Sequence, residues 1–245
     1  MCAGLVAVVV VGCAGAPVPS QTPDPTLPEG VSTPASPRAT PRGTIPAAAT
    51  SRPLPNDTPI APGEYTYGLI PGLRMTFTVA ADGWESWGDG VVKGLTEPTR
   101  MAGFGFGEIA SVHADPCRWQ NGRIEPPLGP TVDDLAAALV ALPHFDLRTS
   151  PETGTVDGFA GTYLKIQIAD DVVIDDCDEQ AFNTYIWTDG TARYHQGPGQ
   201  IEEFWILDVD GKRLLINAAS FPGTDPDHLA ERDVIMDTLT IERLD

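Results

Sequence analysis

Apolar and polar residues alternate along several stretches of the chain, and this pattern predicts half-buried β-strands. The clearest case is 75–79, where Met75, Phe77 and Val79 alternate with threonines. The stretch 201–209 is apolar on both faces, which indicates a central strand, and Asp210-Gly211 after it is typical of a hairpin turn. Further strands are predicted at 103–112, 164–168, 183–187, 214–218 and 239–242.

Two segments have the spacing of amphipathic helices. Thr131 is a suitable N-cap for the first, whose apolar positions recur every three or four residues until Pro143 stops it. Asp225-Pro226 begins the second, which packs through Leu229, Ile235 and Met236. About six mostly antiparallel strands with two helices packed on them predict an α+β fold.

The N-terminal 13 residues carry an apolar run, Ala3 to Gly12. Its length fits the core of a signal peptide and is far short of the ~20 residues that a membrane-spanning helix needs. Val10-Val11-Gly12-Cys13 resembles the bacterial lipobox, which implies cleavage before Cys13 and attachment of acyl chains such as palmitate to it. No Lys or Arg precedes the run, and we interpret this as a start codon placed too late. A plain secretory signal, or a disordered apolar N-terminus, is the alternative.

Residues 14–62 form a separate region by composition, because they hold 13 of the 24 prolines and no aromatic residue. Such a segment buries too little apolar surface to fold, so we expect a disordered linker between the signal segment, 1–13, and a domain at 63–245. Acidic and basic residues cancel within the linker, so the net charge of −19 belongs to the domain. This charge excludes nucleic acid as a partner.

Cys117 and Cys177 remain once Cys2 and Cys13 are assigned to the export segment. An even pair in an exported domain predicts a disulfide. Zinc ligation is disfavoured because the chain has no C-x-x-C motif and no histidine at ligand distance from either cysteine.

Several of these features together resemble a family of actinobacterial envelope lipoproteins whose domain is similar to the PsbP-like fold. The resemblance covers 63–245. It implies a secreted, disulfide-bonded binding module and carries over no catalytic residue. The matching features are the strand into Asp82-Gly83-Trp84, the segment Asp115-Pro116-Cys117-Arg118-Trp119, the helix start Gly129-Pro130-Thr131, Cys177, and the stretch from Trp205 to Ile216.

Catalytic and metal-binding motifs are missing from the sequence. It has no G-x-S-x-G, no S-x-x-K and no H-E-x-x-H, and its four histidines do not pair on a helix. The densest acidic cluster offers hard oxygen ligands to Ca²⁺ but lacks the spacing of an EF-hand loop, so a solvated surface is the favoured interpretation. We assign no metal and no cofactor; the weak calcium candidates are Asp170, Asp171, Asp175, Asp176 and Asp178.

Trp84 and Trp87 lie among glycines where a strand gives way to a turn. They are candidates for the rim of a pocket or a partner surface, although packing in the core is the more ordinary role for tryptophan. The alternation of glycine and phenylalanine at 103–107 predicts a strand that either has another backbone close to it or contains a β-bulge.

The sequence therefore predicts an exported protein, lipid-anchored at the outer face of the cell membrane. Its domain binds an envelope protein or a small envelope ligand without catalysis. The alternative is an envelope hydrolase that acts on cell-wall polymer or lipid through dispersed carboxylates.

Overall fold

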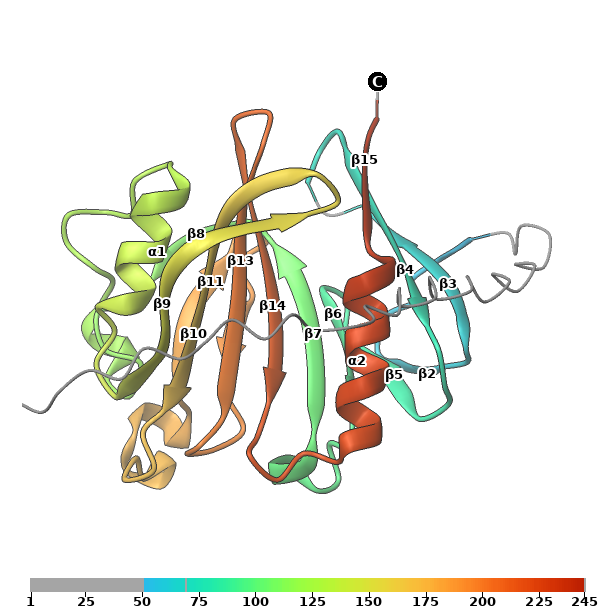
Figure 1. Ribbon diagram of the computed structural model, residues 1–245. Coiled ribbons are helices and arrows are strands. Elements are labelled where there is room, and N and C mark those ends of the chain that lie inside the picture. Colours follow the sequence, from blue (N-terminus) through green and yellow to red (C-terminus); the bar gives the residue numbers. More distant parts are fainter. Residues whose placement is uncertain (1–50, 69, 245) are drawn as a thin grey trace, which may run out of the picture. The chain divides into compact units, whose positions relative to one another are not determined.

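The computed structural model describes residues 51–68 and 70–244 (Figure 1). The signal segment 1–13 with Cys13, and the linker up to residue 50, lie outside these residues. Within the part described, no helix combines the length and the apolar character that crossing a membrane requires.

The largest sheet has eight strands, each antiparallel to its neighbours (Figure 1). It exceeds the six strands expected for the fold, because several of its strands are too short or too exposed to show an apolar alternation. In spatial order the strands are β2 (Thr58–Ile60), β5 (Trp84–Ser86), β6 (Gly90–Lys93), β7 (Ala102–Gly107), β14 (Lys212–Ser220), β13 (Ile201–Val209), β10 (Phe159–Ile168) and β9 (Phe145–Val156).

Two smaller sheets accompany it. One has the order β1 (Arg52–Pro53), β3 (Gly63–Tyr67), β4 (Leu73–Val79) and β15 (Thr240–Arg243). The other has the order β12 (Ala192–Tyr194), β11 (Asn183–Trp187) and β8 (Ile109–Val112). Short 3-10 turns lie at Pro98–Arg100, Trp119–Asn121, Ile174–Asp176 and Asp178–Gln180.

The two helices form where the sequence predicts them. In α1 (Val132–Val140) the Thr131 hydroxyl accepts the backbone N–H of Asp134 at 3.1 Å, and the Asp134 carboxylate accepts that of Thr131 at 2.9 Å. Asp225 caps α2 (Pro226–Thr238). An α+β fold with two helices and mostly antiparallel sheets is therefore confirmed, with a larger sheet than expected.

Both faces of the large sheet are covered, and alternation along its central strands explains how. Ile216 and Ala218 of β14 pack toward α2 and the four-stranded sheet, whereas Leu215 packs toward α1 and β11. Figure 1 shows α2 beside β7 and β4. Because β13 and β14 lie in the interior of the sheet, 201–209 is central, as its apolar faces predict.

Residues 51–62 belong to the folded part, although their prolines place them in the expected linker. β1 pairs with β3, and β2 pairs with β5. The guanidinium of Arg52 donates to the carbonyls of Ala61 and Pro62 at 3.1 and 2.9 Å and lies 4.6 Å from the ring centre of Tyr65. These contacts offset the cost of ordering a proline-rich segment, so the boundary at Gly63 is too late.

Candidate functional site

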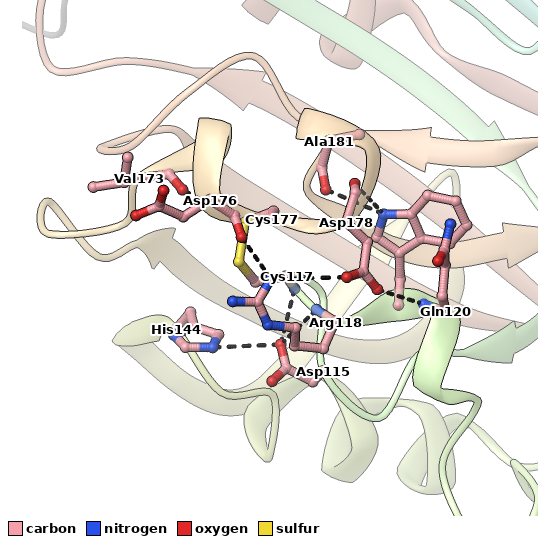
Figure 2. The surroundings of a disulfide bond; sticks show 11 residues. Asp115, Cys117, Arg118, Gln120, His144, Val173, Asp176, Cys177, Asp178 and Ala181 are labelled. Carbon is pink, nitrogen blue, oxygen red and sulfur yellow. Dashed lines mark hydrogen bonds and ion pairs between the residues drawn. A yellow bond between two sulfur atoms is a disulfide. The ribbon is translucent and has the colours of Figure 1, made fainter.

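The disulfide between Cys117 and Cys177 is present, as the cysteine count predicts (Figure 2). Arg118 beside it donates to the carbonyl of Asp176 at 2.5 Å, and His144 lies 3.3 Å from the carboxylate of Asp115. The bridge joins residues 60 positions apart. Closing a loop of that length stabilises the fold by roughly 4 kcal/mol in the chain-entropy model.

The acidic cluster around Cys177 does not gather into a set of ligands. The carboxylate of Asp178 accepts the backbone N–H of Gln120 at 3.0 Å and lies 3.7 Å from the guanidinium of Arg118 (Figure 2). Asp170, Asp171, Asp175 and Asp176 are exposed. Across the described ranges, no three His, Cys, Asp or Glu side chains are arranged to hold a metal ion.

A pocket of about 550 Å³ opens on the face of β7 that carries its glycines. Gly105 lies opposite Asn217 of β14 in the ladder, and both residues line the floor. A β-carbon at Gly105 would meet only the carbonyl oxygen of Asp89, at 3.4 Å. Gly105 thus leaves open a space that a larger side chain would fill.

The close backbone approach predicted for this strand occurs at Gly90 of β6. A β-carbon there would lie 2.4 Å from the carbonyl oxygen of Phe104 and 2.9 Å from Nε1 of Trp87. Only glycine fits at this position. The absence of a side chain at Gly90 lets the indole ring of Trp87 lie against the backbone beside the pocket. Trp87 therefore lies in the pocket lining, half-buried.

Trp84 takes no part in this pocket and packs in the core, the more ordinary of the two roles considered for it. Its side chain is fully buried in the core with α2, and its indole N–H donates to Glu231 at 2.9 Å. Two tryptophans three residues apart thus have different roles, because alternation along β5 turns Trp84 inward before the chain reaches the turn that carries Trp87.

The pocket walls come from segments far apart in the sequence. One wall combines Asn56 and Asp57, which precede β2, with the turn between β5 and β6. The opposite wall is β12 and the turn that joins it to β11. The aromatic residues of the lining are Tyr67, Trp87, Phe104, Trp187 and Tyr194, and the charged ones are Asp57, Asp89, Asp189 and Arg193.

Asp89 is the half-buried carboxylate of this pocket. Burial raises its pKa above the ordinary value, and the nearby charge of Asp189 raises it further, while Arg193 and a hydrogen bond from Trp187 act in the opposite direction. Burial also raises the pKa of the Tyr67 hydroxyl, with Asp89 and Asp189 adding to the effect. The two aspartates and the tyrosine therefore lie in one electrostatic environment.

Arg193 connects the pocket to a buried polar network centred on Glu202. Its Nη2 donates to both carboxylate oxygens of Glu202, at 3.1 and 3.3 Å. The same carboxylate accepts Nε2 of Gln200 and Nδ2 of Asn217, each at 2.6 Å, and lies 3.0 Å from Nδ1 of His195. Burial raises the pKa of Glu202, but Arg193 and His195 outweigh it and bring the pKa to about 2.

Thr184, His195 and Glu202 form a chain of contacts like that of a catalytic triad. The Thr184 hydroxyl contacts Nε2 of His195, whose Nδ1 faces Glu202. A triad needs a nucleophile that the substrate can reach. Thr184 is 0% exposed and lies outside the pocket lining, so this chain of contacts is structural.

A smaller hollow beside α2 contains Glu203 and Arg232. Glu203 accepts the hydroxyl of Tyr163 at 2.8 Å and pairs with Lys165 at 3.0 Å and Arg232 at 3.2 Å. Its charge is thus compensated within the protein. The pocket over β7 is the better candidate for a binding site, because its lining combines aromatic rings with carboxylates.

Part of this site has a signal in the sequence. The glycine–phenylalanine alternation of β7 and the turn tryptophan Trp87 were visible in the sequence, whereas Asp89, Asp189 and Arg193 were not. The Asp189-Gly190 pair marks a turn, but only the folded chain brings that turn over β7.

No protein-family model matches the sequence, and a comparison with curated proteins gives no match. Two solved structures are similar in part. LpqN of Mycobacterium tuberculosis, described as involved in cell envelope biogenesis, is 14% identical with a TM-score of 0.34 over 76% of this chain and 90% of its own. Cyanobacterial PsbP of Synechocystis is 13% identical with a TM-score of 0.36 over 75% and 94%. At these values the likenesses identify neither a family nor a function.

Proposed function

We propose that the chain is an exported protein, lipid-anchored at the outer face of the cell membrane, whose disulfide-bonded domain binds a small envelope ligand without catalysis. The observation that carries this proposal is the pocket over β7. Its volume is about 550 Å³, its floor includes glycine, and aromatic residues contribute to its walls. Open, partly apolar pockets with a few polar groups are the usual form of small-ligand sites.

The disulfide and the sequence around Cys13 support the export and the anchor. Disulfides persist in oxidising compartments outside the cytoplasm. The lipobox-like residues before Cys13 supply the attachment point. Mass spectrometry of membrane-extracted protein tests the anchor: we expect diacylglycerol on residue 13 and loss of residues 1–12. An unmodified Cys13 would contradict it.

A variant that fills the floor tests the binding role. Gly105→Val adds methyl groups above β7 at a position with room for a β-carbon and no positive φ, so the fold is expected to persist. Gly223→Val is the matched control, since Gly223 is exposed and also has room.

Native mass spectrometry of protein purified from its own envelope provides the readout. We expect wild type and Gly223→Val to retain a bound small molecule and Gly105→Val to lose it. Equal retention by all three proteins, or none in the wild type, would contradict a ligand in this pocket.

Catalysis by carboxylates is the second candidate function, because the pocket brings Asp89 and Asp189 together. The raised pKa of Asp89 favours the protonated form that a general acid requires. Turnover of an envelope polymer that is lost in Asp89→Asn while ligand binding persists would favour the hydrolase over the binding protein.

A further inference from the structure

The pocket over β7 has an unbalanced charge. Among the described residues, Asp57, Asp89 and Asp189 line it, and Arg193 is the single basic residue of the lining. Arg193 is already engaged, because its Nη2 pairs with both oxygens of Glu202 and its Nη1 donates to the carbonyl of Tyr194 at 3.1 Å. Glu202 is 0% exposed and is not part of the lining. The charge of Arg193 therefore compensates Glu202, and the three aspartates dominate the pocket.

The aspartates are held so that their carboxylates remain available. Oδ1 of Asp189 accepts the backbone N–H and the hydroxyl of Thr191 at 2.8 and 2.7 Å, which fixes the turn and leaves Oδ2 without a partner among the described residues. None of the three aspartates forms an ion pair closer than 4.0 Å within 51–68 and 70–244. Such a lining repels phosphate and carboxylate ligands.

Aromatic faces supply the other half of the site. Trp87 and Tyr194 come from opposite walls, and Tyr67 lies beside Asp89 and Asp189. The negative face of an aromatic ring attracts a cation, and rings combined with carboxylates are the usual means of holding ammonium groups. A neutral sugar also stacks on such rings, but it leaves the charge of the aspartates uncompensated.

We infer that the pocket binds an organic cation, an ammonium or guanidinium group that lies between the aromatic walls and pairs with Asp89 and Asp189. This inference rests on the proposed binding function and names its ligand class. Because Arg193 pairs with Glu202, Asp89 has no ion-pair partner among the described residues, and the bound cation provides one.

Paired probes test the charge directly. Choline and its uncharged isostere, in which a tert-butyl group replaces the trimethylammonium group, have the same shape and differ in charge. Spermidine adds primary ammonium groups, glycerol phosphate serves as the anion, and trehalose serves as the neutral sugar. Binding to the protein that comprises residues 14–245 is followed by tryptophan fluorescence and by NMR chemical-shift changes.

We expect choline and spermidine to bind, and the isostere and glycerol phosphate to bind at least 10-fold more weakly, since a charge-assisted contact contributes roughly 10–100-fold in affinity. Asp89→Asn and Asp189→Asn are each expected to weaken cation binding roughly 10-fold, and Asp189→Asn keeps an acceptor for Thr191. Asp171→Asn, an exposed acid outside the pocket, is the control and leaves the affinity unchanged.

Protonation gives a second readout. The titratable and charged groups around Asp89 are Tyr67 on β3, Tyr185 on β11, Asp189 in the turn between β11 and β12, Arg193 on β12, and Asp57 in the pocket wall. Cation affinity should fall as acid neutralises Asp89, and this fall should be smaller in Asp89→Asn, where only Asp57 and Asp189 remain to be neutralised.

Two results would overturn the inference in different ways. Equal binding of choline and its isostere, or preferred binding of trehalose, rejects the cation and leaves the binding function standing. Failure of every probe to bind rejects the cation, and the envelope-purified protein with Gly105→Val then decides separately whether the pocket holds a ligand at all.

Discussion

Arg193 acts to lower the pKa of two carboxylates, those of Glu202 and Asp89, which differ in how completely the protein compensates their charge. This difference distinguishes a structural group from a candidate binding group. Glu202 is fully buried and receives hydrogen bonds from arginine and two amides, with His195 alongside. Asp89 is half-buried, faces an open pocket and has no ion-pair partner within 4.0 Å among the described residues.

Their pKa values shift in opposite directions for this reason. Surrounding charges overcome burial at Glu202 and lower its pKa to about 2, whereas burial prevails at Asp89 and raises its pKa. A buried charge that the protein satisfies completely holds the fold together, and one that it satisfies incompletely is available to a ligand.

Replacing each carboxylate by its amide, in Glu202→Gln and Asp89→Asn, should distinguish the two residues. The larger loss of stability is expected for Glu202→Gln. Glu202→Gln leaves the charge of Arg193 buried without its partner, and we expect the free energy of unfolding to fall by about 3–5 kcal/mol. Urea unfolding measures the loss. Glu152→Gln, on the exposed part of β9, is the control and should change stability by less than about 0.5 kcal/mol. A small effect at Glu202 would mean that its network is not structural.

Acid should weaken the Glu202 network specifically. The pKa of Glu202 is lower in the folded protein than its ordinary 4.5, so its contribution is complete above pH ~4.5 and is lost as pH falls toward about 2. Burial also lowers the pKa of His195, so its charging below pH ~6.5 destabilises in the same direction.

The expected loss at Glu202 is on the order of 3 kcal/mol. The free energy of unfolding, measured across this pH range, should fall more steeply with decreasing pH for the wild type than for Glu202→Gln. Parallel curves would contradict the assignment.

Removing the disulfide should affect stability but leave the pocket intact. Replacing Cys117 and Cys177 together by serine is expected to cost roughly 2–4 kcal/mol, because the unfolded chain regains the freedom of a long loop. Neither cysteine lines the pocket, so ligand binding by the folded variant should match the wild type. Thermal unfolding and fluorescence titration measure the two effects; a loss of binding without unfolding would show that the bridge and the pocket are coupled.

The smallest stability effect is expected at Asp89. Asp89→Asn replaces a partly desolvated carboxylate by a neutral amide, so stability at pH 7 should stay within about 0.5 kcal/mol or rise. Because the folded protein raises the pKa of this acid, the wild type becomes relatively more stable as pH falls, and the difference from Asp89→Asn shrinks. A strong loss of stability in Asp89→Asn would place this residue with Glu202 as a structural group.

The sequence predicts the elements whose apolar pattern is strong. Thr131 and Asp225 cap the two helices, and the hairpin turn forms at Asp210 and Gly211, both with positive φ. β9 escaped prediction because it is an edge strand, mostly exposed, and carries Pro151, which an edge tolerates. Residues 52–60 escaped because their prolines conceal the pairing of β1 and β2.

The site was predictable only where the backbone itself constrains the sequence. Gly90 stands out because a β-carbon has no room there, Gly105 because it alternates with phenylalanine, and Trp87 because it lies beside glycines in a turn. Asp89, Arg193 and Glu202 are ordinary charged residues in the sequence, and their roles arise from long-range packing that places β12 over β7 and β14. Glu202 lies at the start of a mostly apolar strand, and its burial has no local signature in the sequence.

The central claim is that the charge of Asp89 is incompletely compensated in the free protein and pairs with a cationic ligand. Carboxyl-carbon NMR tests it most directly, because it measures the pKa of the Asp89 side chain itself. We expect the pKa of Asp89 to lie above the ordinary 3.8 in the free protein and to fall toward that value when choline or spermidine is added. An Asp89 that titrates normally in the free protein, or whose pKa does not change with either cation, would contradict it.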